Sequence, residues 1–519
     1  MIHNILTYAL RQRFMAVAIG FVLVGLGIWA FEQLKIEAYP DISDTQVVVV
    51  TLYPGRAAEE VEQQITIPIE RSLNSVPHVI ARRSRTIFGL SVVELTFDYG
   101  TDDYFARQVV LENLRDADIP DGITPTLGPL STPIGELYRY SLEGPGADPM
   151  KLREAQDWIV TPRFLQVSGV ADVTPFGGLV KQYQIRIDPQ ALTRFNLSVA
   201  QVAQAISANS ANAGGAMLDN GQQSMVIRGV GLVQSVSDLE NVLVNENKNV
   251  PVFLRDVAKV EIGAAIQTGI FGLTEKEREQ KAGVEGIVLM RRGENPSAVL
   301  EGIQEAVDDL NSERLPQGMK IVPIYDRSDL VHNTLHTVTH TLEEGLLIVI
   351  AVLFLFLGSV RAALLTAITI PLSLLFAFVC MHFTGIPANL LSLGALDFGI
   401  IVDGTLVMVE HIVSALEHRR LHGGAMDRPG VLGAIEHAAT SVARPIFFSL
   451  AIIISAYIPL FTLERVERRL FTPMAFTVCY ALLGSLILAL TLIPVISALA
   501  WRCHGSTWSA GCNRTCGDV

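Results

Sequence analysis

The sequence has few cysteines, and none stands in its long polar region. Only five occur in 519 residues, and the stretch from Glu32 to His340 contains none. Cys380 and Cys479 lie in apolar runs, where a free cysteine usually packs as a small apolar residue. We therefore expect the polar region to fold without disulfides. The other three crowd the last 17 residues in a spacing that matches no standard zinc motif, at Cys503, Cys512 and Cys516.

The first apolar run lacks the cleavage site of a secretory signal peptide. It covers Phe14–Phe31 and is followed by "EQLKIEAYPDI", which contains no motif of small residues. We therefore expect a retained membrane anchor. Half of all residues are hydrophobic, and a spanning helix needs roughly 20 apolar residues. The sequence predicts an integral membrane protein with six spans, at Phe14–Phe31, Leu342–Val360, Ala362–Phe383, Ala388–Val413, Pro445–Leu463 and Phe471–Trp501.

A basic excess is also absent. The chain has a formal net charge of −13, and the stretch Glu32–His340 holds 41 acidic and 27 basic residues. The remainder of the chain is therefore close to neutral. This acidic balance argues against nucleic acid as a partner.

The cations of the short loops predict how the chain crosses the membrane. Basic residues in short loops mark the cytoplasmic side. One loop departs from this rule, because "LERVERRLF", between the fifth and sixth runs, carries three Arg against two Glu. On balance the large polar region faces outward. The basic residues on the opposite side are Arg11 and Arg13 before the first span, Arg361 after the second, and Arg419, Arg420 and Arg428 after the fourth.

The polar region alternates strand-like and helix-like patterns. "TQVVVVTLY" is rich in β-branched residues, and Val61, Ile65 and Ile69 then recur at helical spacing. A hairpin and a second helix at Asp102–Ala117 complete a split β-α-β pattern. A comparable set recurs later, with strands predicted at "QYQIRIDP", "SMVIRGVG", "VEGIVLMRRG" and "MKIVPIYDR". We expect two related α+β subdomains with an insertion in the second.

Three carboxylates interrupt the fourth apolar run, "LGALDFGIIVDGTLVMVEH": Asp397, Asp403 and Glu410. On a helix Asp403 and Glu410 share a face, about 10 Å apart along the axis. A turn at Asp403 is excluded because apolar sequence continues through "TLVMV", whereas Glu410 also fits the end of a span. Ionisable residues within a span usually mark an ion pathway, and burial beside other carboxylates raises a carboxyl pKa. The pattern predicts a proton relay.

An intramembrane aspartyl protease is the enzyme alternative. Such proteases carry aspartates in adjacent helices, one of them in a Gly-x-Gly-Asp pattern. The corresponding segment here is "GALD", with Leu396 in place of the second glycine. The only Tyr-Asp pair, Tyr325-Asp326, precedes the second span. We therefore expect no enzyme.

A second candidate site is the segment "HNTLHTVTH" just before the second span. His332, His336 and His340 stand four residues apart on an expected helix. Two histidines at this spacing can bind a divalent metal on one helix face. The alternative is an interfacial helix whose histidines face water or lipid headgroups.

Four stretches together resemble the N-terminal half of a resistance–nodulation–division transporter. The arrangement Asp-Phe-Gly and then Val-Asp-Gly in the fourth run is similar to the heavy-metal efflux branch, whereas the drug-efflux branch has two adjacent aspartates there. The resemblance covers residues 1 to about 500. It is carried by "NLLSLGALDFGIIVDGTLVMVE", "FLGSVRAALLTAITIPLS", "ARPIFFSLAIIISAYIPLFTL" and "LFTPMAFTVCYALLGSLILALTLIPV".

This resemblance implies a transporter of heavy-metal cations, driven by protons that Asp397, Asp403 and Glu410 carry. The implied cargo is zinc, cobalt, cadmium, nickel, copper or silver, with no bound cofactor. The family assembles as a homotrimer in the bacterial inner membrane, with a periplasmic adaptor and an outer-membrane channel. The implied fold is a six-helix transmembrane bundle plus a periplasmic α+β region of ferredoxin-like porter subdomains with an inserted docking segment.

Two features depart from the family. The family chain is about twice as long, and a lysine in its second half pairs with the span-four acids. This sequence has no lysine after Lys320, and its last residues, "WRCHGSTWSAGCNRTCGDV", resemble nothing in the family. We therefore expect a truncated permease. Alternatives are drug export on the same fold, a half-subunit whose second half is supplied in trans, and a membrane scaffold that transports nothing. The predicted segments are the N-terminus with the first span (1–31), the periplasmic porter and docking domain (32–340), the second to sixth spans (341–501) and an atypical C-terminal tail (502–519).

Overall fold

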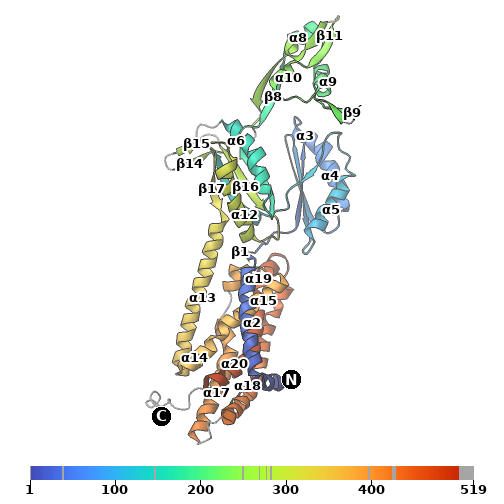
Figure 1. Ribbon diagram of the computed structural model, residues 1–519. Helices are drawn as coiled ribbons and strands as arrows, with labels where there is room; N and C mark the ends of the chain where they lie inside the picture. Colours follow the sequence, from blue (N-terminus) through green and yellow to red (C-terminus); the bar gives the residue numbers. More distant parts are fainter. Residues whose placement is uncertain are drawn as a thin grey trace.

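The computed structural model of the chain has a helical bundle at one end and a large α+β region at the other (Figure 1). The amino terminus lies at the end of the bundle far from the α+β region. Mixed α/β content beside six long apolar helices confirms the predicted fold class. The structure describes residues 2–37, 40–144, 148–221, 223–247, 250–267, 269–275, 278–280, 283–394, 398–422 and 428–501.

Among the described residues, six helical segments are long and apolar enough to cross a membrane, which confirms the predicted number. The third and sixth segments form the centre of the bundle, while the first, second and fifth are largely exposed. The segments are built from α2 (Arg13–Glu32), α13 (Arg327–Leu357), α14 with α15 (Val360–Ala367, Thr369–Thr384), α16 with α17 (Leu390–Gly394, Phe398–Leu421), α18 (Arg428–Ala456) and α19 (Arg465–Leu490).

The sixth span is shorter than the predicted run Phe471–Trp501. Helix α19 ends at Leu490, and a separate helix, α20 (Leu492–Ala500), follows. Thr491 between them has φ −118° and ψ −65°. Pro494 has no N–H to donate to the Leu490 carbonyl, so the helical ladder cannot continue through this point. The predicted run therefore covers parts of two helices, of which α19 is the sixth span.

The first α+β subdomain has a four-stranded antiparallel sheet in the order β3-β4-β2-β5. Side chains of β4 alternate between buried and partly exposed, which is the pattern of a sheet covered on one face. The predicted helical triplet Val61, Ile65 and Ile69 is fully buried against that face. The elements are β2 (Gln46–Leu52), α3 (Ala58–Val61), α4 (Ile67–Ser72), β3 (Val79–Ile87), β4 (Leu90–Phe97), α5 (Asp103–Leu114) and β5 (Thr126–Leu127).

The second subdomain repeats this topology. Its antiparallel sheet has the order β17-β6-β16-β7, so each strand takes the same place as its counterpart in the first sheet. Buried Tyr140 accepts a hydrogen bond from Gln156 Nε2 at 2.8 Å and packs 5.3 Å from the Phe164 ring. The elements are β6 (Glu136–Glu143), α6 (Pro149–Ala155), α7 (Thr161–Leu165), β7 (Val170–Gly177), β16 (Val284–Met290), α12 (Pro296–Asp309) and β17 (Lys320–Asp326).

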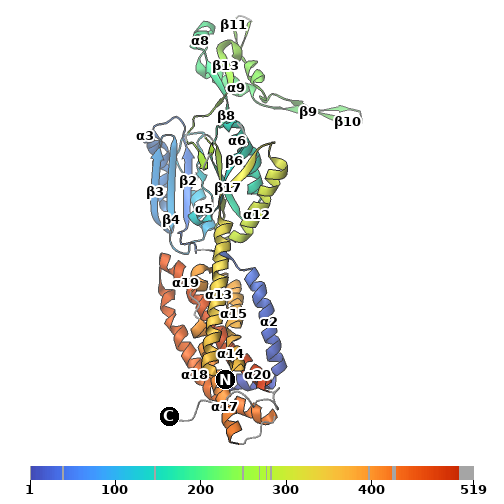
Figure 2. The same cartoon turned by 90° about the vertical axis from the view of Figure 1, so that its left-hand side faces the viewer.

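A long insertion separates β7 from β16 and forms the tip of the molecule (Figure 1). It starts with β8 (Lys181–Ile187), which pairs antiparallel with β13 (Ala258–Ala264). A hairpin of β9 (Ala213–Asn220) and β10 (Gln223–Gly229) extends to one side (Figure 2). The strands predicted from "QYQIRIDP" and "SMVIRGVG" therefore exist but belong to this insertion, and β6 and β7 take their places in the second sheet. Sequence pattern predicts a strand without specifying its partner.

A short pair of parallel strands links the end of the first span to the segment just before the fourth span. Strand β1 (Ile36–Glu37) follows α2 and pairs with β18 (Ala388–Asn389), which precedes the fourth span. Burial raises the pKa of the Glu37 carboxyl, and the neighbouring Asp41 raises it further, while Arg327 partly opposes both effects. The charged form of Glu37 is therefore disfavoured in the folded chain.

We predict that Glu37→Gln stabilises the protein at neutral pH. Because the folded pKa lies above the unfolded value of 4.5, the wild type loses stability as pH rises from that value through the folded pKa. Glutamine stays neutral throughout, so the advantage of the variant should vanish below about pH 4.5. Melting temperatures of both proteins in detergent, from about pH 4 to pH 8, measure this. A difference that does not change with pH would contradict it.

Candidate functional site

Helix α17 presents two of the three predicted relay carboxylates on one outward face. Asp403 and Glu410 are both exposed, and Val407 between them is 44% exposed. Their common face is the one predicted from the seven-residue spacing. The opposite face of the helix, which includes Val402 and Met408, is buried in the bundle. The exposed face is here called the acid stripe. Its residues follow one another at intervals of three or four positions: Gly399, Asp403, Val407, Glu410, Ser414, Glu417 and Leu421.

Close contacts with neighbouring helices fix the rotation of α17 about its axis. A Cβ at Gly404 would lie 3.2 Å from both Ile446 and Leu450, so α18 approaches the helix closely beside Asp403. Ser485 of α19 is buried and donates a hydrogen bond to the Ile401 carbonyl. These contacts hold the buried face inward and thereby direct the acid stripe away from the bundle.

The exposure of the acid stripe differs from what the sequence argument assumed. The pKa argument from sequence requires burial, but the described part of this chain leaves Asp403 and Glu410 exposed. Asp397, the third predicted member, lies outside the described residues. The relay itself stays a prediction.

The predicted histidine site lies on α13, upstream of its most apolar part. His332, His336 and His340 are exposed, and the rings of His336 and His340 are 6.0 Å apart between centroids. His340 Nδ1 also lies 3.6 Å from a Glu344 carboxylate oxygen, a neighbour that the sequence argument did not consider.

The straight helix keeps the three histidines from converging on one ion. His332 and His340 are about 12 Å apart along the axis. Within the described ranges, no group of three or more His, Cys, Asp and Glu side chains is arranged to hold a metal ion. The histidine site therefore stays a prediction, limited to two adjacent ligands.

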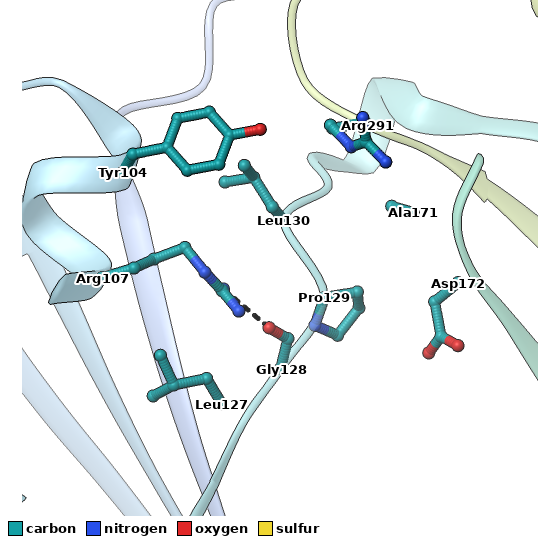
Figure 3. Close-up of a pocket in the computed structure, with 9 residues that line it drawn as sticks. All are labelled: Tyr104, Arg107, Leu127, Gly128, Pro129, Leu130, Ala171, Asp172 and Arg291. Atoms are coloured by element: carbon teal, nitrogen blue, oxygen red, sulfur yellow. Dashed lines mark hydrogen bonds between the residues drawn. The ribbon is translucent and has the colours of Figure 1, made fainter. Parts of the chain in front are cut away.

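A cavity of about 540 Å³ lies between the two α+β subdomains (Figure 3). Arg107 of α5 reaches across one wall and donates a hydrogen bond to the Gly128 carbonyl at 2.8 Å. Burial lowers the pKa of Arg107. The cavity offers a metal cation only one carboxylate, Asp172, against two guanidinium groups, so we do not assign it to metal. Its lining is Tyr104, Arg107, Leu127, Gly128, Pro129, Leu130, Ala171, Asp172 and Arg291.

Sequence comparison relates the whole chain to known efflux proteins. The model of the AcrB/AcrD/AcrF family matches residues 5–508. The cation efflux system protein CzcA of Alcaligenes sp. (strain CT14) is 40% identical over 511 residues, which cover 96% of this chain and 48% of that protein. The cation efflux system protein CusA of Escherichia coli (strain K12) is 37% identical over 505 residues, with coverage of 96% and 48%.

The fold is also similar to a solved structure. A crystal structure of a heavy metal efflux pump superposes with a TM-score of 0.85 at 46% identity and covers 96% of this chain and 48% of that one. The chain therefore spans about half the length of the curated relatives that it matches.

The acid stripe can be tested by cysteine labelling. In the isolated chain, with its five native cysteines replaced by alanine, we predict that Val407→Cys reacts with a membrane-permeant maleimide several-fold faster than Met408→Cys. The two positions are adjacent in depth, but Val407 is 44% exposed and Met408 is fully buried. Mass spectrometry of the labelled protein gives the two rates. Equal rates would show that α17 is rotated differently.

Proposed function

The chain belongs to the AcrB/AcrD/AcrF family of resistance–nodulation–division permeases, and on that premise we propose that it supplies the N-terminal half of a heavy-metal exporter. The proposed activity is export of zinc, cobalt, cadmium, nickel, copper or silver ions in exchange for protons. The relatives named above as cation efflux proteins support this assignment. The observation that carries it is the acid stripe of α17.

A carboxylate within a span can alternate between two states. Ionised Asp403 is disfavoured next to hydrocarbon, so it holds a proton when it faces an apolar surface and releases the proton when water or a cation approaches. Glu410 lies about 10 Å further along the helix, towards its basic end at Arg419 and Arg420. We infer that a proton passes between these two acids, with Asp397 as the third member of the relay.

The exposure of the stripe supports a partner that completes the transport unit. Asp403, Val407 and Glu410 face outward although the other side of α17 is packed. This sequence has no lysine after Lys320, and the family resemblance pairs the acids of the fourth span with a lysine of the C-terminal half. We propose that a C-terminal half, supplied in trans, covers the stripe.

The orientation and the assembly follow from the same proposal. Helix α14 (Val360–Ala367), which contains Arg361, lies at the end of the bundle away from the α+β region (Figure 1), which supports placing that region in the periplasm. The β9–β10 hairpin reaches out from the insertion (Figure 2), and its Met217 and Val226 are 71% and 69% exposed. Such apolar exposure supports a contact with a neighbouring subunit, as in a homotrimer that binds a periplasmic adaptor and an outer-membrane channel.

Two other functions can be separated from this one. Drug export would use the same fold but a different cargo, and it is disfavoured by the Asp-Phe-Gly arrangement that resembles the metal branch. A scaffold that transports nothing would need no carboxylates in the fourth span. The test below distinguishes all three.

We predict that the chain, co-expressed with a C-terminal half from a heavy-metal relative, raises metal tolerance in a sensitised bacterial host. Asp403→Asn should abolish the gain, because asparagine cannot take up or release a proton. Growth on graded zinc, cobalt, cadmium, nickel, copper and silver measures the effect, with the chain alone as a parallel arm.

Glu417→Gln is the matched control, since Glu417 lies on the same face of α17 but beside the basic end of the helix. It should retain tolerance. Loss of tolerance in both variants at equal membrane levels would argue against a relay at Asp403. No tolerance in any arm would remove the export proposal, and tolerance only to organic compounds would favour drug export.

A further inference from the structure

The start of α19 carries cations that the orientation rule leaves unexplained. Its arginines stand at the end of the bundle nearest the α+β region, where basic residues are usually sparse. The Arg469 side chain is only 12% exposed, and one of its nitrogens donates a hydrogen bond to the Ser43 carbonyl. Another lies 3.4 Å from an Asp44 carboxylate oxygen. The guanidinium groups of Arg468 and Arg469 also lie 5.1 and 5.2 Å from the Tyr99 ring centroid. Arg468 and Arg469 at the start of α19 therefore contact the first subdomain.

Arg292 meets the same segment from the second subdomain. Its Nη2 donates to the Ser43 carbonyl at 2.7 Å, and its Nη1 donates to Asp103 Oδ1 at 2.8 Å and to Thr45 Oγ1 at 3.2 Å. Its Nε lies 3.7 Å from an Asp41 oxygen. The Ser43 carbonyl thus accepts hydrogen bonds from two guanidinium groups, one from the bundle and one from the second subdomain. We name this set of contacts, around residues 41–45, the Ser43 junction.

The junction is built from strong and partly buried interactions. Arg292 is 17% exposed and Asp103 is 24% exposed. Hydrogen bonds between ionised partners are about twice as strong as neutral ones, and limited exposure reduces their screening. Thr45 is also anchored in the first subdomain, because Phe97 N–H donates to its carbonyl at 2.8 Å. A displacement of residues 41–45 must therefore move the first sheet.

The same helix that carries Arg469 reaches the neighbourhood of the acid stripe. Ser485 is 16 residues along α19 from Arg469, about 24 Å along the axis, and it donates to the Ile401 carbonyl two residues before Asp403. Pro473 lies within α19 and cannot donate the helical hydrogen bond to the Arg469 carbonyl. The first turn of α19 is thereby less firmly held by the helix and depends more on its contacts at the junction.

The two subdomains also have room to move beside the junction. The cavity of about 540 Å³ separates α5 from β7 there (Figure 3). The backbone N–H of Arg292 donates to the Leu130 carbonyl at 3.2 Å, next to that cavity. The Ser43 junction therefore lies beside the boundary of the two subdomains, where a rigid-body hinge or shear movement can take place.

We propose that Arg469 and Arg292 are positioning residues that pass a movement of α19, set by the state of Asp403, through the Ser43 junction to both α+β subdomains. The proposal rests on the proposed function, because the purpose of such a movement would be to couple proton binding to cation export. The contacts themselves belong to this chain and can be tested without transport.

The test compares hydrogen–deuterium exchange in the purified chain in lipid nanodiscs. Asp403→Asn imitates the protonated acid and is made with Arg469 intact, with Arg469→Gln and with Arg469→Lys. With Arg469 intact, we expect Asp403→Asn to change exchange about two-fold or more in residues 41–52 and in α5. With Arg469→Gln this distant change should disappear while the change within α17 remains. Arg469→Lys, which keeps the charge beside Asp44, should restore it in part.

Arg465→Gln is the matched control, because Arg465 is the first residue of α19 and its side chain is exposed. It should leave the distant change intact. The proposal is overturned if Asp403→Asn has no distant effect, if the effect survives Arg469→Gln, or if Arg465→Gln removes it equally. Equal melting temperatures of the Arg469 variants exclude unfolding as the cause.

The metal-tolerance assay separates this inference from the proposed function. A distant exchange change that depends on Arg469, without metal tolerance in any arm, would support the role of the Ser43 junction and contradict the export function. Metal tolerance that depends on Asp403 but is unchanged by Arg469→Gln would support the export function and contradict the proposed role of the Ser43 junction.

Discussion

A carboxylate in hydrocarbon must be covered, paired or protonated, and the arrangement of this chain follows from that constraint. Helix α17 buries its apolar face against α18 and α19 and leaves Asp403 and Glu410 on the outward face. Close packing at Gly404 prevents the helix from turning the acids inward. The protein therefore holds groups whose charge depends on their surroundings at the surface where those surroundings can change.

The extramembrane region is built so that a small movement at the bundle can be transmitted. Two sheets with the same strand order are each stiffened by their own core, one around Ile65 and one around Tyr140. Between them lie a cavity and the Ser43 junction. Rigid bodies joined at a charged contact shift as units, which suits the proposed coupling between the bundle and the two subdomains.

Much of this architecture was predictable from sequence, because it depends on local periodicity. The six apolar segments, the buried triplet at Val61, and the shared face of Asp403 and Glu410 all follow from helical or strand spacing. The tertiary partners of these helices and strands could not be predicted from sequence. The strands of the insertion were assigned to the second sheet because pattern does not specify pairing, and the exposure of the stripe depends on which helices α17 contacts. In the sequence, the arginines at the start of α19 are visible only as an exception to the charge rule, although their excess signals a contact.

The most direct measurement is the internal pH of proteoliposomes that contain this chain together with a C-terminal half. Metal movement in one direction should be accompanied by proton movement in the other, and both should stop when Asp403 is replaced by Asn. Metal transport without any pH change, or with a pH change that survives the replacement, would contradict the assignment of the acid stripe as the proton path.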